Sequence, residues 1–215
     1  MNQSEKIVHP ISIKYELETN AELGAELGAE LGEGKLQFYV GNQDICSYKK
    51  NNKIESYSWN LFCVVTWLCE NIEYIIGYDP FPLPVSGDNI QTLIEEADKF
   101  ESDDLVEEYL WYNAKSIWIF KHNWFSCREE SILPQVYFRR VENNIEIYWD
   151  NDFWEESGIV FQAPRGSTLV DRKVFKEIIT NFVNSFLEEV SASTSDKKQM
   201  ERIENLNRQL ALNED

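Results

Sequence analysis

The feature that most constrains the fold is an apolar stripe at helical spacing in the C-terminal half of the chain. Apolar residues recur there every three or four positions over about five turns, the pattern of an amphipathic helix. Since 43% of the 215 residues are hydrophobic and 13% are aromatic, the chain can build a core. We expect a closing helix from Asp171 to Val190, with Ser167 or Thr168 as its cap and Asp171 in its first turn. The stripe comprises Val174, Phe175, Ile178, Ile179, Phe182, Val183, Phe186, Leu187 and Val190.

Alternation of apolar and polar residues predicts strands toward both ends of the chain. Segment 35–40 is followed by a turn signal at Gly41-Asn42, and a later pair of β-rich runs is separated by Glu142-Asn143-Asn144. That later pair predicts a β-hairpin, because the separating residues are typical of turns. The predicted strand segments are 7–17, 35–40, 45–48, 136–141, 145–149 and 158–162.

The middle of the chain has helical spacing instead. Residues 56–76 are apolar nearly all round between Leu61 and Leu68, which predicts a helix buried against the sheet. Residues 78–87 contain three prolines and predict a connection without regular structure. Residues 88–110 contain nine acidic residues and one base, and their apolar spacing predicts two amphipathic acidic helices. Residues 111–124 fit either a strand or a helix, and we favour the helix.

Together these patterns predict one α+β domain over residues 1–190, in which a small antiparallel sheet with a hairpin packs against several helices. Residues 21–34 include three copies of Ala-Glu-Leu-Gly, and we interpret them as an exposed insertion because glycine at every fourth position weakens a helix. In residues 191–215, charged residues and apolar residues at helical spacing predict a charged helical tail. Its narrow apolar seam could dock within the chain or on a partner.

Net charge limits the partners. With 38 Asp and Glu against 20 Lys and Arg, the formal net charge is −18, which disfavours direct contact with nucleic acid or an anionic membrane and favours a protein partner with a basic surface. The longest apolar stretch is too short to span a membrane, and the N-terminus resembles no secretory signal, so we expect a cytoplasmic protein. The four cysteines lack the paired spacing of zinc sites, and we expect neither a metal nor a cofactor.

The hairpin holds the main candidate binding residues. Arg139 and Arg140 are neighbours on one strand, so one points toward the core and needs a carboxylate, which Glu146 or Asp150 could supply. This arrangement fits a structural ion pair, and it also fits a clamp for an anion or a carboxylate. The candidate binding set is Arg139, Arg140, Glu146, Trp149, Asp150 and Asn151.

Catalytic motifs are not evident in the sequence. Of the two histidines, His122 has aromatic neighbours and is the one weak candidate for acid–base chemistry, although a structural imidazole is favoured. The sequence contains no GxSxG, P-loop, GxGxxG or HExxH pattern, so the common hydrolase and nucleotide-binding signatures are missing.

Three stretches within residues 122–151 are His122-Asn-Trp, Leu133-Pro134-Gln-Val136-Tyr-Phe138-Arg139-Arg140-Val and Ile145-Glu146-Ile147-Tyr-Trp149-Asp150-Asn151. Together they resemble a segment of uncharacterised bacterial proteins, some of which are fused to zinc metallopeptidases of the ImmA/IrrE kind. In those fusions the peptidase chemistry lies in a separate HExxH domain, which this sequence lacks. The resemblance implies a non-catalytic companion module for recognition in bacterial stress or defence.

The leading hypothesis is therefore a non-catalytic, acidic regulatory protein that binds another protein through its acidic helices and the Arg139 hairpin. One alternative is an enzyme in which His122 acts on an anionic substrate held by Arg139 or Arg140. Another is a mimic of nucleic acid that occupies a DNA- or RNA-binding protein.

Overall fold

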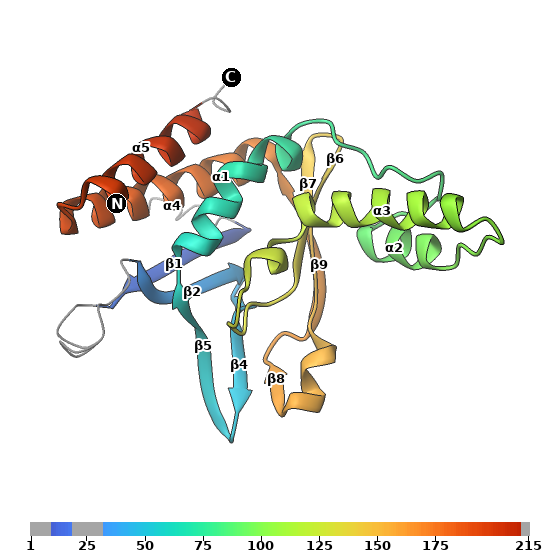
Figure 1. Ribbon diagram of the computed structural model, residues 1–215. Coiled ribbons are helices and arrows are strands. Elements are labelled where there is room, and N and C mark those ends of the chain that lie inside the picture. The colour runs from blue at the N-terminus through green and yellow to red at the C-terminus, as the bar shows by residue number, and fades with distance from the viewer. Residues whose placement is uncertain (1–9, 19–31, 212–215) are drawn as a thin grey trace, which may run out of the picture.

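The computed structural model describes residues 10–18 and 32–211. Within these residues the chain forms two antiparallel sheets and five α-helices, which confirms the α+β class. Figure 1 shows α1, α4 and α5 gathered on one side of the molecule, and α2 and α3 extending from the opposite side. The expected insertion at residues 21–34 falls mostly outside the described residues. Its last part is not exposed, because Gly32 and Gly34 are buried and Glu33 begins a strand.

The larger sheet has the strand order β1-β2-β5-β4-β8, with the short β3 also paired to β2. One expectation here was wrong: residues 56–60 were assigned to a helix but end β5, where Tyr57 pairs with Leu36 of β2. The spacing of Tyr57 and Trp59 fits both a helix and a strand. Pairing with the neighbouring strand β2 makes this segment part of the sheet. The strands are β1 (Ile11–Leu17), β2 (Glu33–Val40), β3 (Gln43–Asp44), β4 (Ser47–Lys50), β5 (Lys53–Asn60) and β8 (Ile159–Phe161).

The smaller sheet has the order β6-β7-β9 and contains the predicted hairpin. Its strands are β6 (Val136–Val141), β7 (Asn144–Asp150) and β9 (Arg165–Asp171). The predicted helix cap at Ser167 or Thr168 was wrong, because both residues lie in β9, paired with Tyr148 and Ile147. The cap is Asp171, whose side chain accepts hydrogen bonds from the backbone N–H groups of Lys173 and Val174.

Three helices cover the main core: α1 (Phe62–Ile76), α4 (Arg172–Ser193) and α5 (Lys197–Ala211). Helix α4 is the predicted closing helix, extended by one turn at its C-terminal end. Helix α5 is the predicted charged tail. Its seam residues Ile203, Leu206 and Leu210 are buried, and the helix packs against α1 and α4, so the seam docks within the chain.

The remaining helices are α2 (Ile90–Asp98) and α3 (Leu105–His122). They confirm the two predicted acidic helices, and α3 also contains most of the segment that fits either a strand or a helix. A small apolar cluster joins this pair to the three-stranded sheet through Ile90, Trp118, Tyr137 and Tyr148. Two short 3₁₀ helices, η1 (Trp124–Cys127) and η2 (Asp152–Ser157), follow α3 and β7.

Candidate functional site

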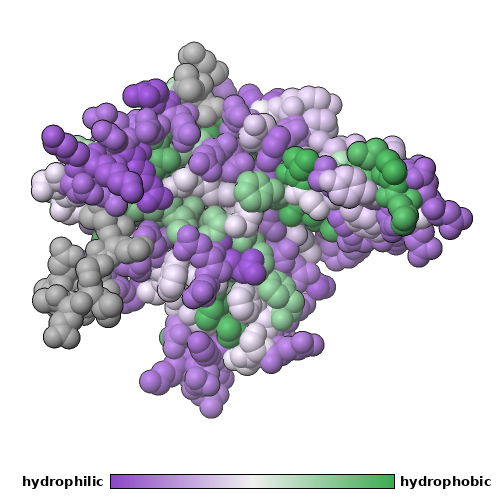
Figure 2. Space-filling view, viewed as in Figure 1, coloured by the Kyte–Doolittle hydropathy of each residue, from purple (hydrophilic) through white to green (hydrophobic). Residues whose placement is uncertain are grey.

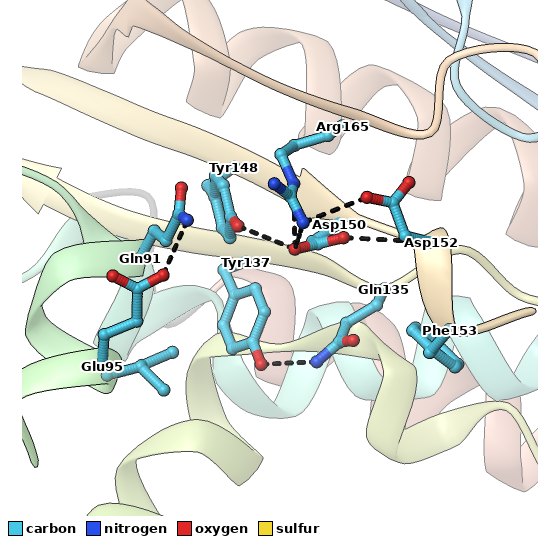
Figure 3. A pocket seen from close by; sticks show the side chains of 10 residues that line it. Gln91, Glu95, Gln135, Tyr137, Tyr148, Asp150, Asp152, Phe153 and Arg165 are labelled. Atoms are coloured by element: carbon cyan, nitrogen blue, oxygen red, sulfur yellow. Dashed lines mark hydrogen bonds and ion pairs between the residues drawn. The ribbon is translucent and has the colours of Figure 1, made fainter. Parts of the chain in front are cut away.

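A cavity of about 370 Å³ lies between α2, the β6–β7 hairpin, the start of β9 and η2 (Figure 3). We call it the tyrosine cavity. Its size is within the range of small-molecule and side-chain binding sites. It is lined by Gln91, Ile94, Glu95, Gln135, Tyr137, Tyr148, Asp150, Asp152, Phe153 and Arg165.

One end of the cavity is an ion-pair network around Arg165. Its Nη2 lies 2.9 Å from Asp150 Oδ2 and 3.0 Å from Asp152 Oδ2, and its Nε donates to Asp150 Oδ2 at 3.1 Å. Asp150 and Arg165 face each other in the register of β7 and β9, so sheet pairing brings them together. Tyr148 donates its hydroxyl to the same Asp150 oxygen at 3.2 Å (Figure 3).

Two tyrosine rings form the adjoining wall. The Tyr137 and Tyr148 centroids are 6.0 Å apart with an angle of 35° between the ring planes, because the two residues pair across the hairpin. Burial raises the pKa of both phenols, and Asp150 raises that of Tyr148 further, so both hydroxyls stay protonated at neutral pH. Gln135 donates its side-chain amide to the Tyr137 hydroxyl. The wall is therefore aromatic and uncharged.

Formal charge in the cavity is unbalanced. Glu95, Asp150 and Asp152 supply three carboxylates, whereas Arg165 supplies one cation, which both aspartates already hold. Glu95 lies across from this network on α2, where it accepts a hydrogen bond from Gln91 at 2.7 Å (Figure 3). A cationic group beside the tyrosine rings would meet both a negative field and the aromatic faces that favour cations.

The hairpin fixes α2 as the opposite wall of the cavity. Arg139 Nη2 lies 2.6 Å from Glu146 Oε2, and Arg139 Nε donates to the same oxygen at 2.8 Å. The other oxygen of Glu146 accepts the backbone N–H of Ile90 at 3.0 Å, and Arg139 donates to the carbonyl of Asp88 at 3.2 Å. Glu146 therefore binds the first residue of α2, where a carboxylate is favoured by the exposed N–H groups of a helix N-terminus.

A protein-family model matches residues 30–199, and its description is family of unknown function (DUF5984). The match covers more than half of the chain and includes every residue of the tyrosine cavity. The chain belongs to this family. No curated protein and no solved structure matches it. The match to DUF5984 does not test the resemblance of residues 122–151 to a module fused to metallopeptidases, which stays a prediction.

Among the predicted binding residues, only Asp150 lines the tyrosine cavity of this DUF5984 protein. Arg139 and Glu146 form the structural ion pair that was one of the two interpretations. Arg140 points elsewhere: its Nε donates to the carbonyl of Glu142 at 2.9 Å and its Nη1 to that of Ile76 at the end of α1. Arg140 thus stabilises a turn and a helix end.

Trp149 and Asn151 also have structural roles. Trp149 donates its indole N–H to the carbonyl of Ala163 at 3.0 Å, and its ring covers Gly166, where a Cβ would come within 2.3 Å of the indole. Asn151 accepts the backbone N–H of Gln135 at 2.7 Å through its side chain. These contacts hold the end of β7 against the segments that precede β6 and β9.

His122 is buried at the C-terminal end of α3 and does not line the tyrosine cavity. Its Nδ1 lies 2.7 Å from the carbonyl of Phe138 and its Nε2 lies 3.2 Å from Asp79 Oδ2, while its ring stacks on Trp118. Burial lowers the pKa of the imidazole, although the Phe138 carbonyl and Asp79 act in the opposite direction. The cavity therefore does not bring together His122 and an arginine of β6, as the enzyme hypothesis requires.

Sequence reasoning missed most of the cavity, notably Tyr137, Tyr148 and Arg165. The two tyrosines occupy facing positions in the predicted hairpin, and that pairing could have identified them. Arg165 fell between the predicted strand 158–162 and the predicted helix cap, so its pairing with Asp150 was not anticipated. Over the described ranges, no three His, Cys, Asp or Glu side chains are grouped so that they could hold a metal ion. No helix within the same ranges combines the length and apolarity needed to cross a membrane.

Proposed function

We propose that this protein is a non-catalytic regulatory protein that binds a protein partner by taking a lysine or arginine side chain of that partner into the tyrosine cavity. The observation that carries the proposal is the charge of the cavity: its lining holds three carboxylates and a single guanidinium, which Asp150 and Asp152 already pair. A cationic side chain would reduce the excess negative charge of the lining and would contact two neutral tyrosine rings. The net charge of −18 would also steer a basic surface toward the molecule.

Contacts within the fold position the walls of the cavity before any ligand enters. Its floor is a paired β-hairpin, and α2 is held to that floor by Glu146 and Arg139. A site whose walls are already positioned loses little conformational entropy when a ligand enters. The anion clamp considered for Arg139 has less support, since Glu146 already satisfies that guanidinium. We assign the function to the cytoplasm, where the four free cysteines would remain reduced.

A titration with short peptides tests the proposal. The probes are acetyl-Gly-Arg-Gly-amide and its uncharged counterpart acetyl-Gly-Gln-Gly-amide, and binding is followed by amide chemical shifts in ¹⁵N-labelled protein. We expect the arginine peptide alone to shift the amides of α2 and the β6–β7 hairpin, with weaker binding at higher salt. Equal binding of the two peptides, or shifts located elsewhere, would reject the cavity as a cation site.

Two charge variants sharpen this test because they should act in opposite directions. Glu95→Gln removes a cavity carboxylate and should weaken binding of the arginine peptide by up to about fivefold, whereas Arg165→Gln frees Asp150 and Asp152 and should strengthen it. Glu101→Gln is the matched control: it removes the same charge from an exposed site outside the cavity. If Glu101→Gln weakened binding as much as Glu95→Gln, net charge and not the cavity would be responsible.

A further inference from the structure

Helix α3 exposes large apolar side chains toward both of its ends. Only Trp118 and His122 of its 18 residues are buried. Figure 2 shows apolar surface over this helix, at the side of the molecule where α2 and α3 extend. The residues of this α3 stripe are Leu105, Val106, Tyr109, Leu110, Ile117 and Phe120, each more than half exposed. Large apolar side chains that gather on the exposed face of one helix mark an interaction surface.

Four of the six residues of the stripe lie symmetrically about its middle, whereas Leu105 and Leu110 have no apolar counterpart. Asn113, an exposed residue, lies at the centre. Val106 precedes it by seven positions and Phe120 follows it by seven, while Tyr109 and Ile117 lie four positions before and after it. Two copies of α3 packed antiparallel about Asn113 would therefore place Val106 opposite Phe120 of the second copy, and Tyr109 opposite Ile117. A two-fold axis requires such self-complementarity.

In this arrangement the charges at the two ends of α3 are also complementary to those of the second copy. The first turn carries Glu107 and Glu108, and the last turn carries Lys121. An antiparallel pair brings the acidic end of one helix to the basic end of the other, and their macrodipoles oppose favourably. A parallel pair would instead place glutamate beside glutamate.

The exposed area is sufficient for a weak dimer. Six large side chains, each more than half exposed, present apolar surface on the order of 500 Å² per copy, taking typical side-chain areas. Two copies together then reach about 1,000 Å², the lower limit for a specific interface. We propose that α3 mediates antiparallel self-association of this chain through the α3 stripe, with a dissociation constant on the order of 10 µM or weaker.

Sedimentation velocity on the full chain, from about 5 to about 500 µM, tests the proposal over a range that brackets micromolar association. We expect a concentration-dependent monomer–dimer equilibrium that Ile117→Glu weakens at least about tenfold, because each copy would bring a carboxylate into an apolar contact. The matched control is Ile54→Glu, the same substitution at an exposed position of β5, which should change the equilibrium by less than about twofold. A wild-type chain that stays monomeric throughout, or equal effects of both variants, would overturn the proposal.

A charge exchange tests the antiparallel arrangement. Glu107→Lys and Lys121→Glu should each weaken the dimer by up to about fivefold, and the double variant should recover wild-type affinity. A double variant no tighter than the single ones would reject the antiparallel geometry. Ile117 and Glu107 do not line the tyrosine cavity, so peptide binding by these variants should be unchanged. The proposal of a dimer and the proposal of a cation-binding cavity can therefore be rejected independently of each other.

Discussion

Helices α3 and α4 have similar apolar patterns but opposite environments. Helix α4 buries seven of its 22 residues, and its stripe faces β1 and the core shared by both sheets. Helix α3 buries two of 18 residues, and most of its apolar side chains face solvent. The difference shows that apolar periodicity identifies a helix with an apolar face, whereas the neighbouring chain segments decide whether that face is covered.

The largest expected effect is the loss of stability when the Phe186 ring is removed from α4, compared with removal of the Phe120 ring from α3. Phe186 of α4 is completely buried and packs edge-on against Phe62, with ring centroids 5.1 Å apart. We expect Phe186→Ala to lower the free energy of unfolding by about 3–5 kcal/mol, because it leaves a cavity in the core. Phe120→Ala on α3 should change it by no more than about 0.5 kcal/mol, since that ring is 60% exposed. Urea unfolding of both variants measures the contrast, and similar losses would contradict it.

The next effect concerns the ion pair that joins the hairpin to α2. Glu146→Gln leaves the Arg139 guanidinium largely buried without its countercharge, and we expect a loss of about 3 kcal/mol in unfolding free energy. Hydrogen exchange of the α2 amides should also accelerate, because Glu146 holds Ile90. Glu96→Gln is the control: its pair with Lys99 is exposed, so its loss should cost less than about 0.5 kcal/mol. Protection of α2 that is equal in both variants would show that the ion pair does not position this helix.

The smallest effect is a pH dependence at His122, the buried polar residue that anchors α3. Burial lowers the pKa of its imidazole below the ordinary 6.5, so the unfolded chain binds the proton at higher pH than the folded chain. The stability that depends on neutral His122 is therefore present above pH 6.5 and is lost as pH falls from there toward the folded pKa. Asp79 and Lys121 are the charged groups that act on the ring.

Urea unfolding of the wild type and of His122→Gln, between about pH 7.5 and pH 5.5, measures this contribution across the ordinary histidine range. Other groups titrate in both proteins, so the informative quantity is the difference between the two pH slopes. We expect the wild type to lose more stability toward low pH than the variant. Parallel slopes would mean that the folded protein does not resist protonation of His122.

The sequence was most informative where the interactions are local. The hairpin of β6 and β7 and the apolar stripe of α4 follow from alternation and helical spacing within a few residues. The carboxylate partner of Arg139 was also within reach, because Arg139 and Glu146 face each other across a short turn. Sequence reasoning therefore anticipated a structural ion pair in the hairpin, beside the alternative of a binding clamp, but not that this pair positions α2.

The tyrosine cavity depends on contacts between distant residues, and these were missed. Arg165 meets Asp150 only because β9 pairs with β7, a pairing that the sequence did not indicate. Likewise, Glu146 meets Ile90 across 56 positions of the chain, and this contact decides where α2 lies. Contacts between such distant residues depend on strand order and register, and the spacing of nearby residues predicts neither.

The sequence by itself determined the α+β class, the hairpin, the closing helix and the strongly negative charge, because each is a property of composition or of neighbouring residues. Only the tertiary structure decided that the seam of α5 is buried, that the stripe of α3 is exposed, and that three carboxylates meet two tyrosines in one cavity. The physical reason is that local periodicity orients side chains relative to their own helix or strand. Burial and ion pairing depend on which distant segments then pack against that face.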